Sequence, residues 1–353
     1  MKIINLIENT EGRSGCACAH GLSFYIETRN HRLLLDLGPS GEPLKNAQTL
    51  GIDLAGVDTV ILSHGHYDHS GGILPFAQIN KQAAIYMQES ATGDYYSDRG
   101  SSAPERYEYI GIDKNIAKLP RVRFLQGDFK IDEELELFTI KKRSHSLPTA
   151  NRRILVRKGD HFQCDDFVHE QFLVIRQSRE SILSSDTGTD SGTCTGAYTG
   201  TDIGAYTETD TGAYTRADTG ACTGTDTGAY TGVSPGDGSA NEDMNKPLQG
   251  NLSILMSGCA HSGILSILDA FCEKYGKAPD LAISGFHLMK KTEYTGDEIR
   301  EIEEIARELR KYSTRFITCH CTGIPAFNRM KEIMGDQLEY VHSGEEIDLS
   351  LFI

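Results

Sequence analysis

The chain has 353 residues, enough for one large domain or two ordinary ones, and its 39% hydrophobic and 24% charged residues are typical of a globular protein. A formal net charge of −15 argues against nucleic acid as a partner, because phosphate binding needs a basic surface. The sequence lacks a run of about 18 apolar residues, so no membrane span is expected. The nine cysteines, an odd count with close pairs, indicate a reducing compartment and therefore a cytoplasmic protein.

Short apolar runs separated by Gly and Asn predict a series of strands in the first part of the chain. They cover residues 2–7, 22–28, 31–37, 57–62, 84–87 and 122–125. The first run lacks the long apolar region and cleavage site of a signal peptide, so we interpret it as a strand. A helix is expected after Pro43, with Gly51 as its stop signal.

The second part of the chain alternates predicted strands with predicted helices. Residues 172–176 and 252–256 predict the two arms of one hairpin. Residues 296–312 have apolar side chains at the spacing of an amphipathic helix, and a strand at 315–319 and a short helix near 326–334 follow. Alternation of strands and helices in both halves predicts an α/β layered domain.

An eight-residue unit recurs between Thr195 and Ser234, with Asp at its eighth place in four copies. The unit contains almost no aliphatic residue larger than Ala, so it cannot bury enough apolar area to offset the entropy lost on ordering. We therefore expect residues 186–244 to be a disordered insert in the hairpin loop, with a metal-binding repeat or a small β-solenoid as the alternative. Residues 1–185 plus 245–353 are expected to form a single domain.

The strongest signal in the sequence is the block SHGHYDHSGG at residues 63–72, directly after an apolar strand. It holds four candidate metal ligands, His64, His66, Asp68 and His69. Alternation along an extended segment directs His64 and His66 to one ion, while Asp68 and His69 follow where the chain turns and could reach a second. Imidazole and carboxylate ligands suit zinc and neighbouring divalent metals. The alternative, a chance cluster of solvated histidines, is disfavoured by this density.

Three later histidines each follow an apolar strand, and strand ends that meet at one rim can complete a metal cleft. We expect His261 and His320 to be ligands. His287 is expected to be a ligand or substrate contact, or else a hydrogen-bonded structural residue. We expect Cys259 to be a buried inert cysteine, with ligation through its thiolate as the alternative. Asp36 is expected to orient the ligand histidines, unless it is an ordinary residue of a turn.

The pattern His-x-His-x-Asp-His resembles the signature of the metallo-β-lactamase superfamily. The resemblance implies a four-layer αββα sandwich that holds two divalent metal ions, zinc first, with Mn, Fe or Mg as alternatives. It also implies that His64 and His66 bind one ion and that Asp68 and His69 bind the other. Further blocks are similar to a branch that includes the dihydropteroate-synthase-like and ribofuranosylaminobenzene-phosphate synthase group; they lie at residues 20–23, 33–38, 258–263, 285–288 and 320–323.

Two features of the commoner superfamily pattern are missing. The chain has no Gly-His-Thr-type motif before the hairpin, and Cys259 stands where an aspartate that bridges the two metals would be sought. His145 lies near the expected distance for the missing histidine, but its surroundings differ and we expect it at the surface. Asp165 and Asp166 could touch the cleft, with solvated acids as the alternative. Further histidines are expected to be exposed, namely His161, His169 and His342.

These features predict a metal-dependent hydrolase that uses a metal-bound hydroxide on an ester, phosphoester or amide of a small molecule. Asp68 would bind metal and orient or deprotonate the attacking water. The branch resemblance implies an alternative, a phosphoribosyl-type transferase (synthase) related to pterin-cofactor biosynthesis. A di-iron redox or sensor protein is disfavoured by His66, because flavin-coupled relatives typically carry Glu there; a non-catalytic metal-binding module is a fourth reading. Residues 89–111, with Arg99 and Arg106, are expected to form a lid.

Overall fold

Six strands form the first large sheet of the molecule, which the computed structural model describes over residues 1–178 and 251–352. In sheet order they are β1 (Lys2–Ile7), β2 (Ser23–Glu27), β3 (Arg32–Leu35), β4 (Thr59–Ile61), β5 (Ala84–Gln88) and β8 (Val122–Leu125). Along β2, Phe24 and Ile26 face the central core and Tyr25 faces a helical layer, as the two-residue period of a strand requires. The six strands predicted in this half are thus confirmed to within two residues at each end.

Seven strands form the second large sheet. In sheet order they are β17 (Leu338–Tyr340), β16 (Arg315–Thr318), β15 (Leu281–Ser284), β14 (Asn251–Met256), β13 (Phe172–Ser178), β10 (Leu135–Phe138) and β9 (Phe129–Lys130). Strands β13 and β14 pair antiparallel from Leu173↔Met256 to Ser178↔Asn251, so the predicted hairpin is confirmed. The predicted insert at its tip lies outside the described residues.

Helices cover the outer face of each large sheet. They are α1 (Glu42–Thr49), α3 (Ile73–Ile79), α5 (Ile264–Tyr275), α6 (Gly296–Leu309) and α7 (Ile324–Met334), while the single turn of α2 (Tyr67–Ser70) lies in the segment after β4. The predicted start of α6 is confirmed, because Thr295 and Glu298 form a reciprocal capping box there. Single-turn 3-10 helices connect other segments, at Leu54–Gly56, Glu89–Thr92, Ile116–Lys118, Thr149–Arg153, His320–Thr322, Gly335–Gln337 and Leu349–Phe352.

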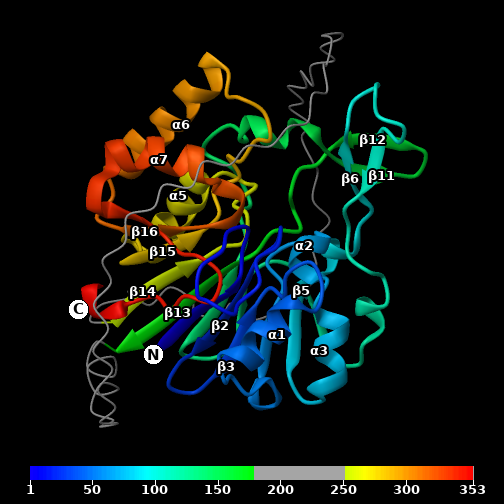
Figure 1. Cartoon of the computed structure of the whole chain (residues 1–353), viewed down its shortest axis with the longest axis vertical. Helices are drawn as coiled ribbons and strands as arrows, with labels where there is room; N and C mark the ends of the chain where they lie inside the picture. The colour runs from blue at the N-terminus through cyan, green and yellow to red at the C-terminus, as the bar shows by residue number, and fades with distance from the viewer. Residues whose placement is uncertain (179–250, 353) are drawn as a thin grey trace, which may run out of the picture.

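The two sheets pack face to face, with α1 and α3 outside one and α5, α6 and α7 outside the other (Figure 1). Alternate residues of β14 divide between the two sides of its sheet. Ile254 enters the core between the sheets and Leu255 enters the core under the helices. Three apolar layers therefore separate four layers of secondary structure, and the predicted αββα sandwich is confirmed.

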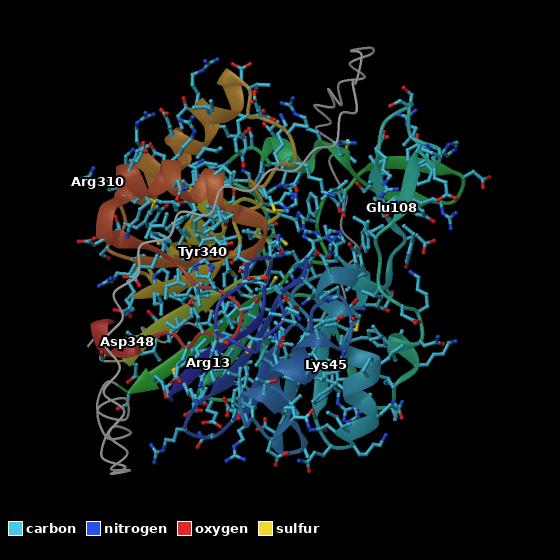
Figure 2. All side chains as sticks on the ribbon, viewed as in Figure 1. Arg13, Lys45, Glu108, Arg310, Tyr340 and Asp348 are labelled. Atoms are coloured by element: carbon cyan, nitrogen blue, oxygen red, sulfur yellow. The ribbon has the colours of Figure 1, made fainter. Side chains whose placement is uncertain are left out.

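A smaller four-stranded sheet projects from the sandwich (Figure 1). In sheet order it contains β12 (His161–Cys164), β11 (Ile154–Lys158), β6 (Tyr95–Asp98) and β7 (Tyr107–Tyr109). Residues 89–111, expected to form a lid, thus build paired strands in the projection. Figure 2 shows Glu108 on this projection, on the opposite side of the molecule from Arg310 beyond the end of α6. Arg106 pairs with Asp98 at 2.9 Å within the projection and does not line the main pocket.

The parallel strands of both sheets end at one shared edge. Strand β4 runs parallel to β3 and β5, while β14, β15 and β16 run parallel to one another. The segments that follow these strands carry the sequence blocks at 63–72, 258–263, 285–288 and 320–323. The topology therefore gathers blocks from distant parts of the chain at this edge. Within the described residues, no helix is long and apolar enough to cross a membrane.

Candidate metal centre

The segment after β4 carries four of the expected ligands into the interior. His64 and His66 lie on an extended stretch, and Asp68 and His69 lie on the single turn of α2. All four side chains are buried. The tight turn needs Gly71, because a Cβ atom there would overlap the carbonyl oxygen of Pro39. The segment thus buries four polar side chains together, out of contact with solvent.

Four buried imidazoles present one ring nitrogen without a hydrogen-bond partner, namely Nε2 of His64, His66, His261 and His320. In three of them Nδ1 is held by the protein. His64 Nδ1 lies 2.8 Å from Ser63 Oγ, His261 Nδ1 lies 2.9 Å from Asn151 Oδ1 and His320 Nδ1 lies 2.7 Å from Asn9 Oδ1. A buried polar atom without a partner is costly, and imidazole nitrogens held in this way are typical of metal ligands.

His64 and His261 form the first group of candidate ligands with Cys259, and the ring of His66 lies beside them. Ligand atoms of His66 also lie within 4.8 Å of those of Asp165 and His169. The nitrogen atoms of His64 and His261 and the sulfur of Cys259 lie within 4.8 Å of one another. The ring centroid of His66 lies 4.6 Å from that of His64 and 4.9 Å from that of His261. Three imidazoles and a thiol are a donor set that suits zinc.

Asp68, His69 and His320 form the second group, on the other side of Cys259. Ligand atoms of His69, His320 and Cys259 lie within 4.8 Å of one another. Asp68 Oδ2 is 3.6 Å from His320 Nε2 and 3.8 Å from His69 Nε2. Cys259 Sγ lies 3.2 Å from His69 Nε2 and belongs to both groups.

Burial and neighbouring charge give the two groups different protonation in the protein without metal. Burial lowers the pKa of His66 to about 3 and holds the pKa of His64 and His261 well below the usual value, so these imidazoles are neutral near pH 7. Burial opposes the charged form of His69, but Asp36 and Asp68 outweigh it and raise its pKa to about 9. Neutral imidazole is the form that binds a metal ion.

Asp36, which follows β3, connects the candidate ligands to the sheet. Its carboxylate accepts hydrogen bonds from the Ser63 backbone N–H and hydroxyl, each at 2.7 Å, and lies 2.6 Å from His69 Nδ1. The residue adopts a positive φ of 59°, which is strained for a side chain other than glycine. These contacts match the orienting position expected for Asp36.

Several polar residues around the ligands were missed by sequence reasoning. Glu170 accepts hydrogen bonds from the backbone N–H groups of His261 and Ser262, at 2.7 and 2.8 Å, and so holds the loop after β14. Asn9 and Asn151 hold His320 and His261, as described above. Asn9 lies two residues after β1, and this position near a strand end was the one feature of the sequence that pointed to it. Nothing in the sequence pointed to Asn151 or Glu170 as residues of the site.

His169 contradicts the expectation that it is exposed. It is fully buried, its Nδ1 accepts from the Gly65 N–H at 3.0 Å, and its Nε2 lies 3.0 Å from Asp165 Oδ2. The reason is topological, because His169 lies three residues before the start of β13, at the edge that carries the site. The expectation of a solvated acid is likewise wrong for Asp165, which is buried. His342 is half-buried, whereas His145 and His161 are exposed as expected.

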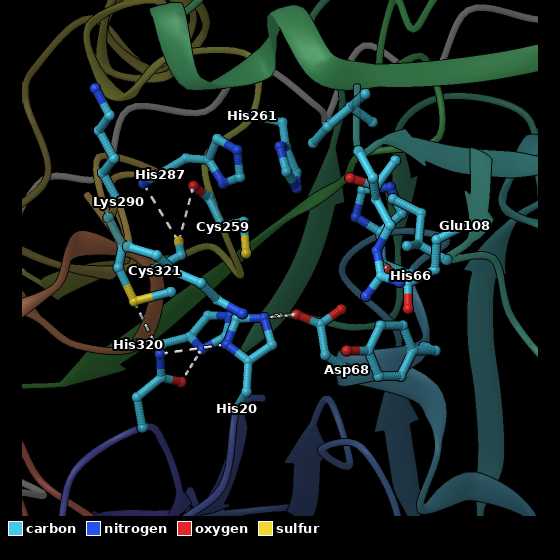
Figure 3. A pocket seen from close by; sticks show the side chains of 18 residues that line it. His20, His66, Asp68, Glu108, Cys259, His261, His287, Lys290, His320 and Cys321 are labelled. Atoms are coloured by element: carbon cyan, nitrogen blue, oxygen red, sulfur yellow. Dashed lines mark hydrogen bonds and ion pairs between the residues drawn. The ribbon is translucent and has the colours of Figure 1, made fainter. Parts of the chain in front are cut away.

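A cavity of about 640 Å³ opens over the ligands. Figure 3 shows side chains from distant segments directed into it, among them His20, His66, Asp68, Cys259, His261, His287, His320 and Cys321. His20 is half exposed, and its Nε2 lies 3.5 Å from Asp68 Oδ2. His287 stacks obliquely on His261, with ring centroids 4.1 Å apart, and its Nδ1 is buried without a partner. The arrangement can hold cations at the floor of a pocket that admits a small molecule.

Comparisons with known proteins agree with this geometry. The family described as the metallo-beta-lactamase superfamily matches residues 18–146. The chain is 21% identical, over 98% of both chains, to an uncharacterized protein of Methanocaldococcus jannaschii. It is 25% identical to the 7,8-dihydropterin-6-methyl-4-(beta-D-ribofuranosyl)-aminobenzene-5'-phosphate synthase of the same organism, over 98% of this chain and 96% of that protein.

A solved structure shares the whole architecture. It is titled a metal-dependent hydrolase of the beta-lactamase superfamily, and it aligns with a TM-score of 0.64 and 22% identity over 99% of this chain and 98% of its own. The family match covers the ligand block after β4, and the structural alignment covers both sheets and the helices outside them. The chain therefore has the fold of the metallo-β-lactamase superfamily, and residues 18–146 match the model of that family.

Proposed function

We propose that the protein is a metal-dependent hydrolase that acts on an ester, phosphoester or amide of a small molecule. The observation that carries this proposal is the set of buried imidazoles with an unpartnered Nε2 atom, of which His66, His261 and His320 line one pocket. The proposed ligands are His64, His66, Asp68, His69, His261 and His320, with Cys259 between the two groups. Two divalent ions held there, zinc first, would lower the pKa of water to about 7 and polarise a substrate oxygen.

Asp68 is the residue we propose to handle the proton of the attacking water. Burial opposes ionisation of its carboxyl, but His69, His320 and His20 outweigh burial and hold its pKa well below the usual range. Its Oδ2 lies on the pocket wall and can accept a hydrogen bond from water there. A carboxylate that stays ionised at neutral pH orients a water molecule and receives its proton transiently.

Cationic side chains on the outer wall support a substrate with an anionic group. Arg99, Lys290 and Lys291 line the pocket. Arg99 is paired with Glu108 at 2.8 Å and Lys290 with Glu298 at 2.7 Å, so part of their charge is already compensated. A phosphate or carboxylate on the substrate would extend these pairs into a network.

The test is elemental analysis of the purified protein, followed by a screen of phosphoesters and lactones with and without the metal found. We expect turnover that a chelator abolishes and the metal restores. His261→Ala should lower both metal content and turnover, whereas His145→Ala, an exposed histidine paired with Asp269 at 3.0 Å, should change neither. Turnover that persists unchanged after complete metal removal would refute the proposal.

A second candidate function is a phosphoribosyl-type transferase. It is favoured by the 25% identity to the synthase of Methanocaldococcus jannaschii over nearly the whole of both chains. In that reaction the pocket would hold the phosphates of a phosphoribosyl donor, and an acceptor molecule would attack the donor in place of water. Product analysis with a phosphoribosyl donor and an aminobenzoate separates the two candidates, because a transferase yields a joined product and a hydrolase yields only the hydrolysed donor.

A further inference from the structure

Beside the two ligand groups lies a third cluster that the proposed hydrolase chemistry does not use. Ligand atoms of Cys259, His287 and Cys321 lie within 4.8 Å of one another. They come from the segments after β14, β15 and β16, three adjacent parallel strands. Figure 3 shows the three side chains together at one side of the pocket. Two thiols and an imidazole are soft donors, which distinguishes this cluster from the histidine and carboxylate ligands next to it.

His287 has one ring nitrogen that nothing in the described part of the chain satisfies. Its Nδ1 is buried and has no hydrogen-bond partner, although polar atoms in such positions are usually paired. The residue adopts a positive φ of 50°, a strained backbone conformation for histidine. Strain of this kind persists where the surrounding structure requires it, and here it keeps the ring beside the two thiols.

Cys321 is a buried thiol with two hydrogen-bond partners, and it donates to the carbonyl oxygen of Cys259 at 3.6 Å. The backbone N–H of His287 donates a hydrogen bond to its Sγ at 3.3 Å, which stabilises negative charge on sulfur. A Cβ atom at Gly285 would lie 2.5 Å from the same sulfur, so only glycine lets the strand approach it. Zinc binds sulfur at about 2.3 Å and imidazole nitrogen at about 2.0 Å, so ligand atoms around one tetrahedral ion stand about 3.4–3.8 Å apart. The ligand atoms of this cluster, within 4.8 Å of one another, would draw together around an ion.

We propose that Cys259, His287 and Cys321 form a third, sulfur-rich position for a soft divalent ion. All three residues line the pocket, so a fourth coordination position faces its interior. Cys259 is shared with the neighbouring ligand groups, and this is the one point at which the inference rests on the proposed metal centre. Thiolate ligands select zinc or cobalt over magnesium or manganese. The third position therefore fills with the soft metals only.

The experiment is a cobalt titration of the full chain, followed by its absorption spectrum and by elemental analysis. We expect about three cobalt ions per chain and a strong sulfur-to-cobalt charge-transfer band. Cys321→Ser should lose about one ion and a large part of that band. The matched control is Cys272→Ser, a free cysteine on α5 outside the pocket, which should bind as the original chain does. His287→Gln is the second variant, and it should lose the same ion while both thiols remain.

The outcomes separate this inference from the proposed function. Two ions per chain, with the same charge-transfer intensity in the original chain and in Cys321→Ser, would overturn the third position and leave the binuclear centre intact. Failure of the chain to bind any cobalt would overturn both. Loss of one ion in Cys321→Ser and in His287→Gln, with native circular dichroism, supports the third position, because unfolding would remove all the ions together.

Discussion

Individual histidines at this site differ in which ring nitrogen is free, and that difference depends on single hydrogen bonds. Asn9 and Asn151 each offer a side-chain oxygen to Nδ1 of a histidine, at 2.7 and 2.9 Å. An oxygen acceptor favours the tautomer with the proton on Nδ1, so the lone pair of Nε2 is available to a metal ion. Two asparagines far apart in sequence thus prepare His320 and His261 for binding.

Asn151→Ala and Asn9→Ala should each weaken metal binding about 10–100-fold, because loss of a ligand's hydrogen-bond partner has that effect. Competition with a chromophoric chelator measures the affinity. Asn151→Asp keeps the acceptor oxygen and should recover most of the loss. Asn115→Ala, on an exposed asparagine, serves as the control and should leave affinity unchanged. Equal affinities for Asn151→Ala and the control would contradict the orienting role.

Metal binding should also depend on pH through His69. Asp36 and Asp68 outweigh burial and raise the pKa of His69 to about 9, so its ring is protonated at neutral pH in the metal-free protein. A metal ion must displace that proton, and apparent affinity should therefore rise as pH increases from 6 toward about 9. Titration in two weakly buffered solutions with a pH indicator should detect released protons, of which His69 contributes about one near neutral pH. Affinity that falls over this range would contradict the assignment.

At the scale of elements, the two large sheets are tied by a histidine outside the metal site. His31, in the turn between β2 and β3, lies 2.8 Å from Asp58 Oδ1 through Nδ1 and 2.7 Å from Asp132 Oδ2 through Nε2. Asp58 precedes β4 in the first sheet, and Asp132 lies between β9 and β10 in the second. One protonated imidazole between two carboxylates therefore connects both layers.

This link should make stability depend on pH in a defined window. Burial opposes the charged form of His31, but the two carboxylates outweigh it and raise its pKa, so its stabilisation is complete below about pH 6.5 and is lost as pH rises through the folded-state pKa. Burial opposes ionisation of Asp132, but His31 outweighs it and lowers the pKa of this carboxyl. The stabilisation that Asp132 contributes is therefore complete above about pH 3.9 and is lost as the pH falls through the folded-state pKa.

The corresponding substitution is His31→Ala. Because the site is only partly shielded from solvent, we expect a loss of about 1 kcal/mol near pH 5.5, shrinking toward alkaline pH. Urea unfolding at several pH values measures it. A loss that is constant from pH 5 to pH 9 would mean that the histidine charge is not involved.

Helix α5 shows how strongly one helix can anchor the second sheet. Phe271 is fully buried, and its ring lies 6.2 Å from that of Phe138 on β10 and 4.5 Å from that of Tyr275. Phe271→Ala should lower the free energy of unfolding by about 3–5 kcal/mol, because it removes buried apolar area and leaves a cavity. The exposed Lys311→Ala is the control and should change stability by less than about 0.5 kcal/mol. Thermal or urea unfolding checks both.

At the scale of the whole molecule, the domain should fold without the repeated segment. Strands β13 and β14 pair in register up to Ser178↔Asn251, so a short turn can join them there. Replacement of residues 180–249 by a short Gly-Asn-containing turn should preserve the fold, the metal content and the turnover. Circular dichroism and elemental analysis of the shortened chain measure this. Loss of metal with an intact fold would show that the segment contributes to the site.

The local pattern of this sequence was enough for the order of strands and helices and for the ligand block. Apolar period and turn residues located β1 to β5, the hairpin of β13 and β14, and helices α1, α6 and α7, because these depend on neighbours in the chain. They did not locate the small projecting sheet. Its strands are short, and β6 pairs with β11, more than fifty residues away, which no local period predicts.

The sequence by itself indicated the metallo-β-lactamase fold, because His64, His66, Asp68 and His69 lie within six residues and their spacing is specific. The tertiary structure alone decided which distant residues surround them. Asn9, Asn151, Glu170, His169 and Cys321 reach the site because strands from both sheets end at one edge. That convergence depends on pairing between strands far apart in sequence, and the spacing of a single residue type along the chain carries no information about it.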